Sequence, residues 1–139
     1  MFNLIKEFEG FREKAYKCPA GIWTIGYGST FYEDGAKVAD GDTITKEKAE
    51  NLVKWYCENK ITLPHGDFSE NQKEALFSLI YNIGQAAFNK SNCKKFIEEK
   101  NWKKAYESWD WVKAGGEVLS GLVKRRNNER KLFFERLLE

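Results

Sequence analysis

The chain has 139 residues, of which 42% are apolar and 32% are charged, a composition typical of a soluble globular protein. This length suits one domain with a single hydrophobic core and is too short for two. The formal net charge of +2 is too weak to indicate nucleic-acid binding by itself. The basic cluster at residues 124–131 has acidic residues nearby, so we interpret it as a solvated helix face and expect no nucleic-acid partner.

The N-terminal residues lack the unbroken apolar stretch of a secretory signal, because Lys6, Glu7 and Glu9 interrupt it. No run in the sequence approaches the roughly 18 apolar residues that indicate a membrane-spanning helix. We therefore expect no membrane insertion, and a protein that is made in a cytoplasm or is a mature fragment.

The first predicted element is a helix that ends near Gly10, followed by a small hairpin or meander. The apolar residues of this helix follow helical spacing: Phe2, Leu4, Ile5 and Phe8. From Ala15 to about Thr30, glycines separate short segments that favour β-structure, including the stretch "GIWTIGYGS". The sequence therefore places its only predicted sheet close to the N-terminus.

Helices account for most of the remaining chain. Thr45 is a candidate N-cap for a helix that runs to about Lys60. Ser69 and Gln72 form a capping-box pattern before a helix that ends at Gly84. Three further helices are expected near residues 92–100, 102–113 and 121–138, with a loop or broken helix at "AGGEVLSG" before the last. One small sheet followed by helices indicates an α+β fold.

Three cysteines, Cys18, Cys57 and Cys93, are odd in number and widely spaced. They match neither a zinc-binding pattern nor a complete disulfide framework. We expect reduced thiols, two of them buried as small apolar residues. No cluster of aspartate or histidine has the spacing of metal ligands, so we expect no metal and no cofactor.

Two carboxylates near the end of the first helix differ in their position relative to its apolar face. When residues are placed about 100° apart, Glu7 falls roughly opposite the apolar stripe and Glu9 falls at its border. Partial burial disfavours the charged form of a carboxyl group, which is what a general acid near neutral pH requires. Periodicity leaves a structural alternative open, in which Glu9 pairs with a nearby cation such as Arg12.

The last predicted helix carries arginines on its apolar face. Arg126 and Arg130 share that face, whereas Arg125 is expected to point away from it. An inward arginine requires a partner, because an unpaired buried charge is very costly. Glu9 and Glu129 are the two candidate partners.

The stretch "EGFREKAYKCPAGIWTIGYGST" resembles the glutamate-plus-hairpin signature of the phage-type lysozymes, glycoside hydrolase family 24, which are the endolysins of many tailed phages. Weaker similarity continues in "VADGDTITKEKAE", "NQKEALFSLIYNIG" and "WVKAGGEVLSGLVKRRNNERKLF", so the resemblance covers nearly the whole chain. It implies a single lysozyme-like catalytic domain over residues 1–139. A small N-terminal β-hairpin lobe and a larger helical lobe would border its cleft.

The family's active site is a glutamate, eight residues, an aspartate or less often a cysteine, five residues and a threonine, which here gives Glu9, Cys18 and Thr24. The resemblance implies hydrolysis of the β-1,4 bond between N-acetylmuramic acid and N-acetylglucosamine in peptidoglycan. Glu9 would protonate the leaving oxygen, and Thr24 would orient the water. Cys18 stands where a carboxylate is commoner, and three roles stay open for it: base or electrostatic stabiliser, nucleophile forming a glycosyl thioether, or a nearly passive residue.

Four residues are expected to bind substrate or support the site. Tyr27 either lines the cleft or packs inside the hairpin. Gly121 and Leu122 precede the final helix, near where relatives meet the substrate, and Arg126 is a supporting residue. The tryptophans are interpreted mainly as core residues, and His65 as a surface loop residue.

Two other functions stay open. A lytic transglycosylase needs only one acid/base glutamate and would explain the missing second carboxylate, although Thr24 argues against it. A wall-binding or inhibitor-like relative with an inactive site is the other. A disulfide from Cys18 to Cys57 or Cys93 would block the site, and some membrane-anchored relatives are controlled through such a cysteine.

The resemblance also implies partners and a location. The binding partner would be the glycan strands of peptidoglycan, and we expect a monomer. The enzyme would accumulate in the cytoplasm of a bacterial host and reach the wall in the periplasm after a separate pore-forming holin opens the membrane.

Overall fold

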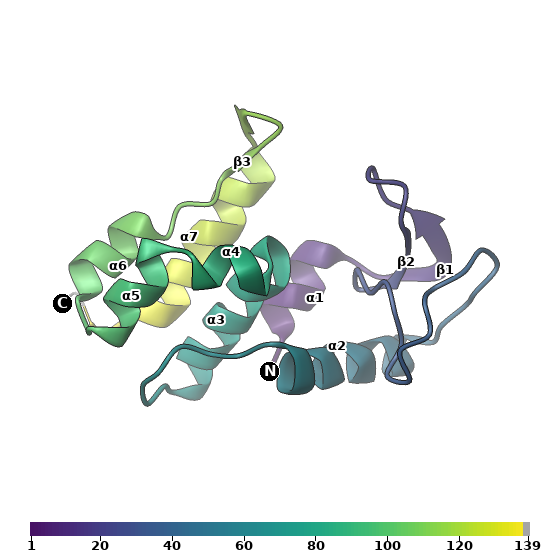
Figure 1. Cartoon of the computed structure of the whole chain (residues 1–139), viewed down its shortest axis with the longest axis horizontal. Helices are drawn as coiled ribbons and strands as arrows, with labels where there is room; N and C mark the ends of the chain where they lie inside the picture. Colours follow the sequence, from purple (N-terminus) through teal and green to yellow (C-terminus); the bar gives the residue numbers. More distant parts are fainter. Residues whose placement is uncertain (138–139) are drawn as a thin grey trace. The chain divides into compact units, whose positions relative to one another are not determined.

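The computed structural model describes residues 1–137, which form two compact units. Residues Phe2–Lys60 make up the hairpin unit, and the chain from Ile61 onward, with Met1, makes up the helical unit. Helices predominate and the sheets are small and antiparallel, so the predicted α+β class is confirmed (Figure 1). The single domain expected over residues 1–139 stays a prediction.

The hairpin unit begins with the predicted helix and hairpin. Helix α1 (Asn3–Glu9) ends at Gly10, whose backbone N–H donates to the carbonyl of Lys6. Strands β1 (Arg12–Lys17) and β2 (Trp23–Gly26) then pair antiparallel. Tyr16 pairs with Thr24 and Lys17 with Trp23, and the register shifts between Arg12 and Tyr16.

The loop after β2 returns to the other edge of β1. Lys14 forms a bridge with Thr43, and the Ile44 N–H donates to the Glu13 carbonyl over 2.9 Å. Because backbone groups of successive strand residues alternate in direction, residues 42–44 border the edge of β1 opposite to β2. Helix α2 (Lys46–Lys60) follows, and the predicted cap is confirmed by the Lys48 N–H donating to Thr45 Oγ1.

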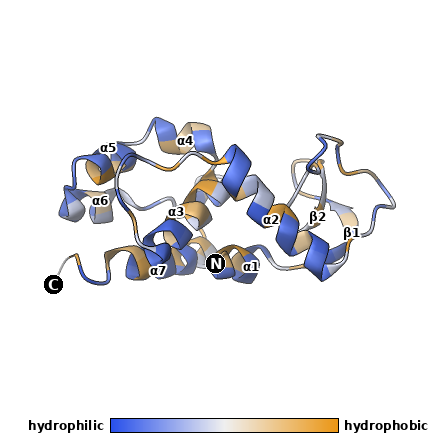
Figure 2. Cartoon of the chain, turned by 90° about the horizontal axis from the view of Figure 1, so that it is seen from below, coloured by the Kyte–Doolittle hydropathy of each residue, from blue (hydrophilic) through white to orange (hydrophobic). Residues whose placement is uncertain are grey.

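The helical unit begins with a hydrogen-bonded capping box. Ser69 accepts from the Gln72 backbone, while the Gln72 side chain accepts from the Ser69 backbone, and Gly84 ends the helix, all as predicted. This helix, α3, contacts α7, and its buried residues are 75–80, where hydrophobic orange segments are visible in Figure 2. The helices of the unit are α3 (Glu70–Ile83), α4 (Gln85–Asn89), α5 (Asn92–Glu98), α6 (Trp102–Ser108) and α7 (Ser120–Phe134).

Two predicted helices are shorter than expected. The helix expected over residues 102–113 ends at Ser108. The stretch expected as a loop or broken helix forms a second hairpin, β3 (Lys113–Ala114) and β4 (Glu117–Val118). Its two central residues are Gly115 and Gly116, with φ of 60° and 82°, the left-handed pair that a tight two-residue hairpin turn requires. The last predicted helix, expected to run to about Leu138, ends at Phe134, and Leu138 itself lies outside the described residues.

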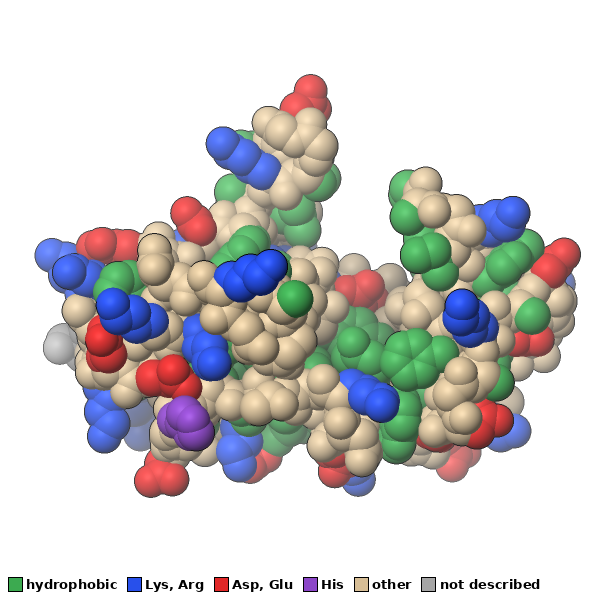
Figure 3. Space-filling view, viewed as in Figure 1, with side chains coloured by type: hydrophobic (Ala, Val, Ile, Leu, Met, Phe, Trp, Pro, Cys, Tyr) green, Lys and Arg blue, Asp and Glu red, His purple; other side chains and the backbone are tan. Residues whose placement is uncertain are grey.

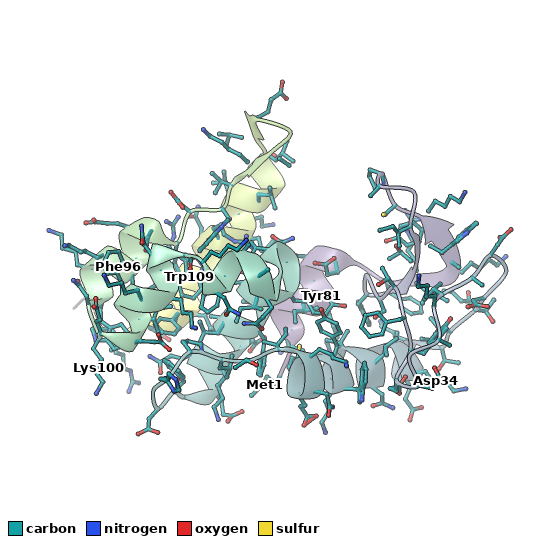
Figure 4. All side chains as sticks on the ribbon, in the orientation of Figure 1. Met1, Asp34, Tyr81, Phe96, Lys100 and Trp109 are labelled. Carbon is teal, nitrogen blue, oxygen red and sulfur yellow. The ribbon has the colours of Figure 1, made fainter. Side chains whose placement is uncertain are left out.

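A buried ionic cluster joins α7 to α3. Glu129 accepts hydrogen bonds from the Ser78 hydroxyl and, over 3.1 Å, from the indole N–H of Trp109, and it forms an ion pair with Arg126 over 2.7 Å. All four side chains are buried. Arg126 is therefore inward as predicted, with Glu129 as its partner. Trp109, labelled in Figure 4, is fully buried and so belongs to the core as predicted.

The prediction that Arg125 points away from the core is wrong. Its exposed fraction is 3%, and its guanidinium donates to the hydroxyl and carbonyl of Ser78 and lies 3.5 Å from Glu129. Residues three and four positions before Glu129 occupy neighbouring places on one helix face, so both arginines reach the same carboxylate. Arg130, predicted inward, is half-exposed, and it donates to Asn127.

None of the helices formed by residues 1–137 has the length and apolar character needed to cross a membrane. On the face of the molecule shown in Figure 3, lysine and arginine side chains alternate with acidic ones. That face therefore carries no continuous basic area of the kind that nucleic-acid binding requires. His65 is exposed, as predicted.

We expect Glu129→Gln to lower the free energy of unfolding of the protein by about 3 kcal/mol or more, because the change leaves two buried arginines without a counter-charge. Urea unfolding followed by circular dichroism measures this. Glu107→Gln, at an exposed position of α6, is the matched control and should change stability by less than about 0.5 kcal/mol. Equal unfolding midpoints for the two variants would contradict the stabilising role of Glu129.

Candidate active site

Glu9 is the last residue of α1, and its half-buried carboxylate lies against the turn that follows β2. Ile25 and Ser29 close this turn by exchanging two backbone hydrogen bonds of 2.8 and 2.9 Å. A Cβ atom added to Gly28 would lie only 2.9 Å from Glu9 Oε1. The turn and the carboxylate are thus in close contact, and a side chain at residue 28 would require the Glu9 carboxylate to shift.

Cys18 directly follows β1 and opens the turn that joins the two strands. Its N–H donates to the Ile22 carbonyl over 3.0 Å, and its carbonyl accepts from Gly21 over 2.8 Å. The backbone N–H of Ile22 is the main cause that lowers the pKa of the Cys18 thiol, with smaller contributions from the Ala20 backbone and the Thr24 hydroxyl, while desolvation opposes them. The turn therefore surrounds a half-exposed thiol with hydrogen-bond donors that favour its ionised form.

Thr24 lies on β2, with an exposed fraction of only 5%. Its hydroxyl donates to the Ile22 carbonyl over 3.0 Å, and the same hydroxyl contributes to the lowered pKa of the Cys18 thiol. A hydroxyl has one proton, so it donates either to that carbonyl or to the thiolate. The structure thus brings together two of the three predicted catalytic residues and places both on the hairpin whose other end contacts Glu9.

Cys57 and Cys93 differ sharply from Cys18. Both are buried free thiols, and burial is the main cause that raises the pKa of each to about 12. The expectation that two of the three cysteines are buried is confirmed, and the reduced state of all three stays a prediction. Among residues 1–137, no group of three or more histidine, cysteine or acidic side chains is arranged to hold a metal ion.

The other predicted site residues occupy different environments. Tyr27 has an exposed fraction of 3%, and its ring centre lies 5.5 Å from that of Phe11, as in the packed alternative. In the helical unit, Arg126 is fully buried and donates to the Trp111 carbonyl over 3.2 Å, which is a structural role. Gly121 and Leu122 lie in the first turn of α7, where Gly121 is exposed and Leu122 half-exposed.

Two residues of this site were not singled out from the sequence. Gly28 makes the close approach to Glu9, and Ile22 supplies the backbone N–H and carbonyl that contact Cys18 and Thr24. The alternation of glycine and tyrosine in "IGYGS" was a signal for the first. Nothing in the residue type indicates the second, because Ile22 acts through its backbone.

Comparison with known proteins gives consistent matches. The family model described as "Phage lysozyme" matches residues 6–129. The endolysin of Bacillus phage B103 is 40% identical over 138 residues, which cover 94% of this chain and 51% of that protein. The chain thus spans about half the length of this relative.

The endolysin of Salmonella phage P22 is 40% identical over 133 residues, covering 93% of this chain and 91% of that one. Among solved structures, the endolysin from Escherichia coli O157:H7 phage FAHEc1 superposes with a TM-score of 0.80 at 31% identity, covering 96% of this chain and 90% of that one. The match therefore includes both the hairpin unit and the helical unit.

Thr24→Val should move the reaction of Cys18 with iodoacetamide to higher pH. The substitution removes a hydroxyl that favours the thiolate, so the pKa of the Cys18 thiol rises. Alkylation rates across a pH series, with the modified cysteine identified by mass spectrometry, measure this shift. Thr30→Val is the matched control in the same unit, and an unchanged pH dependence in both variants would exclude the contact.

Gly28→Ala should displace the Glu9 side chain, whereas Gly35→Ala should not. The two glycines have almost equal φ values of 87° and 86°, so both variants carry the same backbone cost of about 1–2 kcal/mol. Only at Gly28 would the new methyl group meet Glu9, because nothing lies within 4 Å of the corresponding position at Gly35. The NMR resonance of the Glu9 carboxyl carbon reports the difference, and equal shifts in both variants would argue against close packing.

Proposed function

Because the chain belongs to the phage lysozyme family, we propose that it hydrolyses the β-1,4 bond between N-acetylmuramic acid and N-acetylglucosamine in bacterial peptidoglycan. Membership makes it a glycosidase of the lysozyme type, and its relatives are endolysins, which act on the cell wall. The resemblance expected from the sequence and the lysozyme-like fold are both confirmed by these matches. The single observation that supports the residue assignment is that Cys18 and Thr24 share the hairpin whose following turn packs against Glu9.

Glu9 is proposed as the general acid. It is half-buried at the end of a helix, and the turn that packs against it limits the space around its carboxyl group. A general acid donates its proton to the leaving glycosidic oxygen as the bond to the anomeric carbon breaks. The hairpin supplies the fixed geometry that this proton transfer requires.

Cys18 and Thr24 are proposed to act on the attacking water. In a single displacement, the water oxygen bonds to the anomeric carbon on the face opposite the acid, and the water proton passes to a base. The donors around Cys18 lower its pKa, which supports the role of base or electrostatic stabiliser over that of a passive residue. The Thr24 hydroxyl both donates and accepts, so it suits the orientation of that water.

A lytic transglycosylase is the second candidate. The observation that favours it is the thiol at the position where a second carboxylate is commoner. Such an enzyme releases 1,6-anhydro ends without using water, so a residue that orients water would have no purpose in it. The buried hydroxyl of Thr24 beside Cys18 therefore supports hydrolysis.

The enzyme is proposed to be a monomer that accumulates in the host cytoplasm and reaches the wall after a separate holin opens the membrane. The resemblance to endolysins supports this route. Its binding partner in this proposal is the glycan strand of peptidoglycan. A single catalytic domain over residues 1–139 is part of the same proposal and is supported by the family match over residues 6–129.

Glu9→Gln should lower the rate of release of reducing-end muropeptides from purified peptidoglycan by about 10³-fold or more, because the amide has no acidic proton to donate. Mass spectrometry of the products under reducing conditions measures this. Glu7→Gln, the exposed neighbour on the same helix, is the matched control and should retain the wild-type rate. Cys18→Ser, tested in parallel, should be slower than wild type but faster than Glu9→Gln if the thiolate assists the water.

Each alternative function gives a different product pattern. Anhydro-muropeptides from the wild type would assign a transglycosylase. An unchanged rate for Glu9→Gln would remove Glu9 from the mechanism. The absence of any product from the wild type would leave a wall-binding relative as the remaining function.

A further inference from the structure

A pocket of about 450 Å³ lies within the hairpin unit. Its lining includes residues 42–44, which border the edge of β1 opposite to β2, and it contains none of the three candidate catalytic residues. The volume falls in the range of about 300–1,000 Å³ that is typical of small-molecule sites. The polar side chains that line it are Tyr32, Glu33, Asp42, Thr43, Lys48 and Asn51.

Asp42 lines one side of this pocket, and two hydrogen bonds fix the position of its carboxylate. Its Oδ2 accepts the Tyr32 hydroxyl over 2.7 Å and the Ala39 backbone N–H over 2.9 Å. The Ala39 N–H, followed by the Tyr32 hydroxyl, lowers the pKa of Asp42, while desolvation, followed by the bond to Asp42, raises the pKa of Tyr32 to about 12. The pocket therefore presents a fixed carboxylate beside a protonated phenol at neutral pH.

Hydrogen bonds within the loop stabilise the segment that carries Tyr32 and Glu33. The Tyr32 N–H donates to the Ala36 carbonyl over 2.9 Å, and the Ala36 N–H donates to Asp34 Oδ1 over 2.9 Å. Asp34, labelled in Figure 4, marks the position of this loop. The phenol and both carboxylates of the pocket thus come from a hydrogen-bonded frame, which limits the ordering cost of binding a ligand.

Helix α2 supplies the positive charge of the pocket through Lys48. Lys48 and Asn51 lie three residues apart on α2 and so occupy one helix face. Within residues 1–137, the side chains of Lys48, Asn51 and Glu33 form no hydrogen bond or ion pair with other residues. The pocket therefore offers an ammonium, an amide and a carboxylate to a ligand, in addition to the fixed carboxylate of Asp42.

We propose that this pocket binds a short peptide that carries both a free amine and a free carboxylate, as the peptide stems of peptidoglycan do. Lys48 would pair with the ligand carboxylate, Asp42 and Glu33 with its amine, and the Asn51 amide with a peptide group. A neutral sugar has no group that matches three charged side chains, so the charges favour the peptide over the glycan. The proposal rests on the proposed function for the choice of polymer.

The test is an NMR titration of the ¹⁵N-labelled full chain with a synthetic L-Ala–D-Glu–L-Lys–D-Ala tetrapeptide, which contains no glycosidic bond. The expected result is a set of shifts confined to residues 32–51. Lys48→Ala should raise the dissociation constant of the peptide about tenfold. Amidation of the peptide carboxylates should have the same effect, because each change removes the same charge-assisted contact. Lys54→Ala, an exposed lysine of α2 outside the pocket, is the matched control and should bind as the wild type does.

Three results would overturn the proposal: no shifts with the tetrapeptide, equal binding by the Lys48 and Lys54 variants, or shifts at these residues produced by a tetramer of N-acetylglucosamine instead. Cleavage of purified peptidoglycan by the same preparation is measured separately. Cleavage without peptide binding rejects the pocket and leaves the proposed function standing. Peptide binding at residues 32–51 without cleavage supports the pocket and rejects the proposed function.

Discussion

The pairing of two short strands is the constraint on which the candidate active site depends. Tyr16 opposes Thr24 across β1 and β2, and this register sets the Thr24 hydroxyl beside Cys18. A slip of one residue would turn Thr24 to the other face of the sheet, because strand side chains alternate. Two turns border these strands, one between β1 and β2 and the other after β2. One supplies backbone donors to a thiol, and the other packs a glycine against a carboxylate.

In the helical unit, a single carboxylate balances two arginines that are adjacent in the sequence. Glu129 receives hydrogen bonds from α3 and from Trp109 while pairing with Arg125 and Arg126 of its own helix. Such a cluster adds little net stability relative to apolar packing, but it is costly to break. Because its bonds join α7 to Ser78 of α3, the cluster also favours one rotation of α7 relative to α3.

Much of the fold could be predicted from local patterns. Ser69 with Gln72 and the glycine after Ile83 set the limits of α3, and hydrophobic spacing located α1 and α2. The β3–β4 hairpin was not predicted, because strands of two residues have no measurable alternation and only the paired glycines mark their turn. The burial of Arg125 could not be predicted either, since its partner Ser78 is far away in the sequence and belongs to another helix.

In the candidate site, too, some features could be predicted from the sequence and others could not. Motif spacing predicted Glu9, Cys18 and Thr24 as catalytic residues, which stays a prediction, and the structure places Cys18 and Thr24 on one hairpin. Spacing did not decide between the two environments open to Tyr27, because an aromatic residue in a glycine-rich turn suits both a cleft wall and a core. The pocket beside Asp42 had no signal at all, because its residues come from a loop and a helix that meet only in three dimensions.

The three thiols have different environments, so they differ in how readily they are oxidised, both in a purified sample and in an oxidising compartment. Oxidants and disulfides react with thiolates, and burial keeps Cys57 and Cys93 protonated and out of reach. Cys18 alone is half-exposed with a lowered pKa. Thiol oxidation in the folded protein is therefore directed to the Cys18 sulfur. Its first products are a sulfenic acid or a mixed disulfide with a small thiol, formed at the candidate site itself while the core thiols stay reduced.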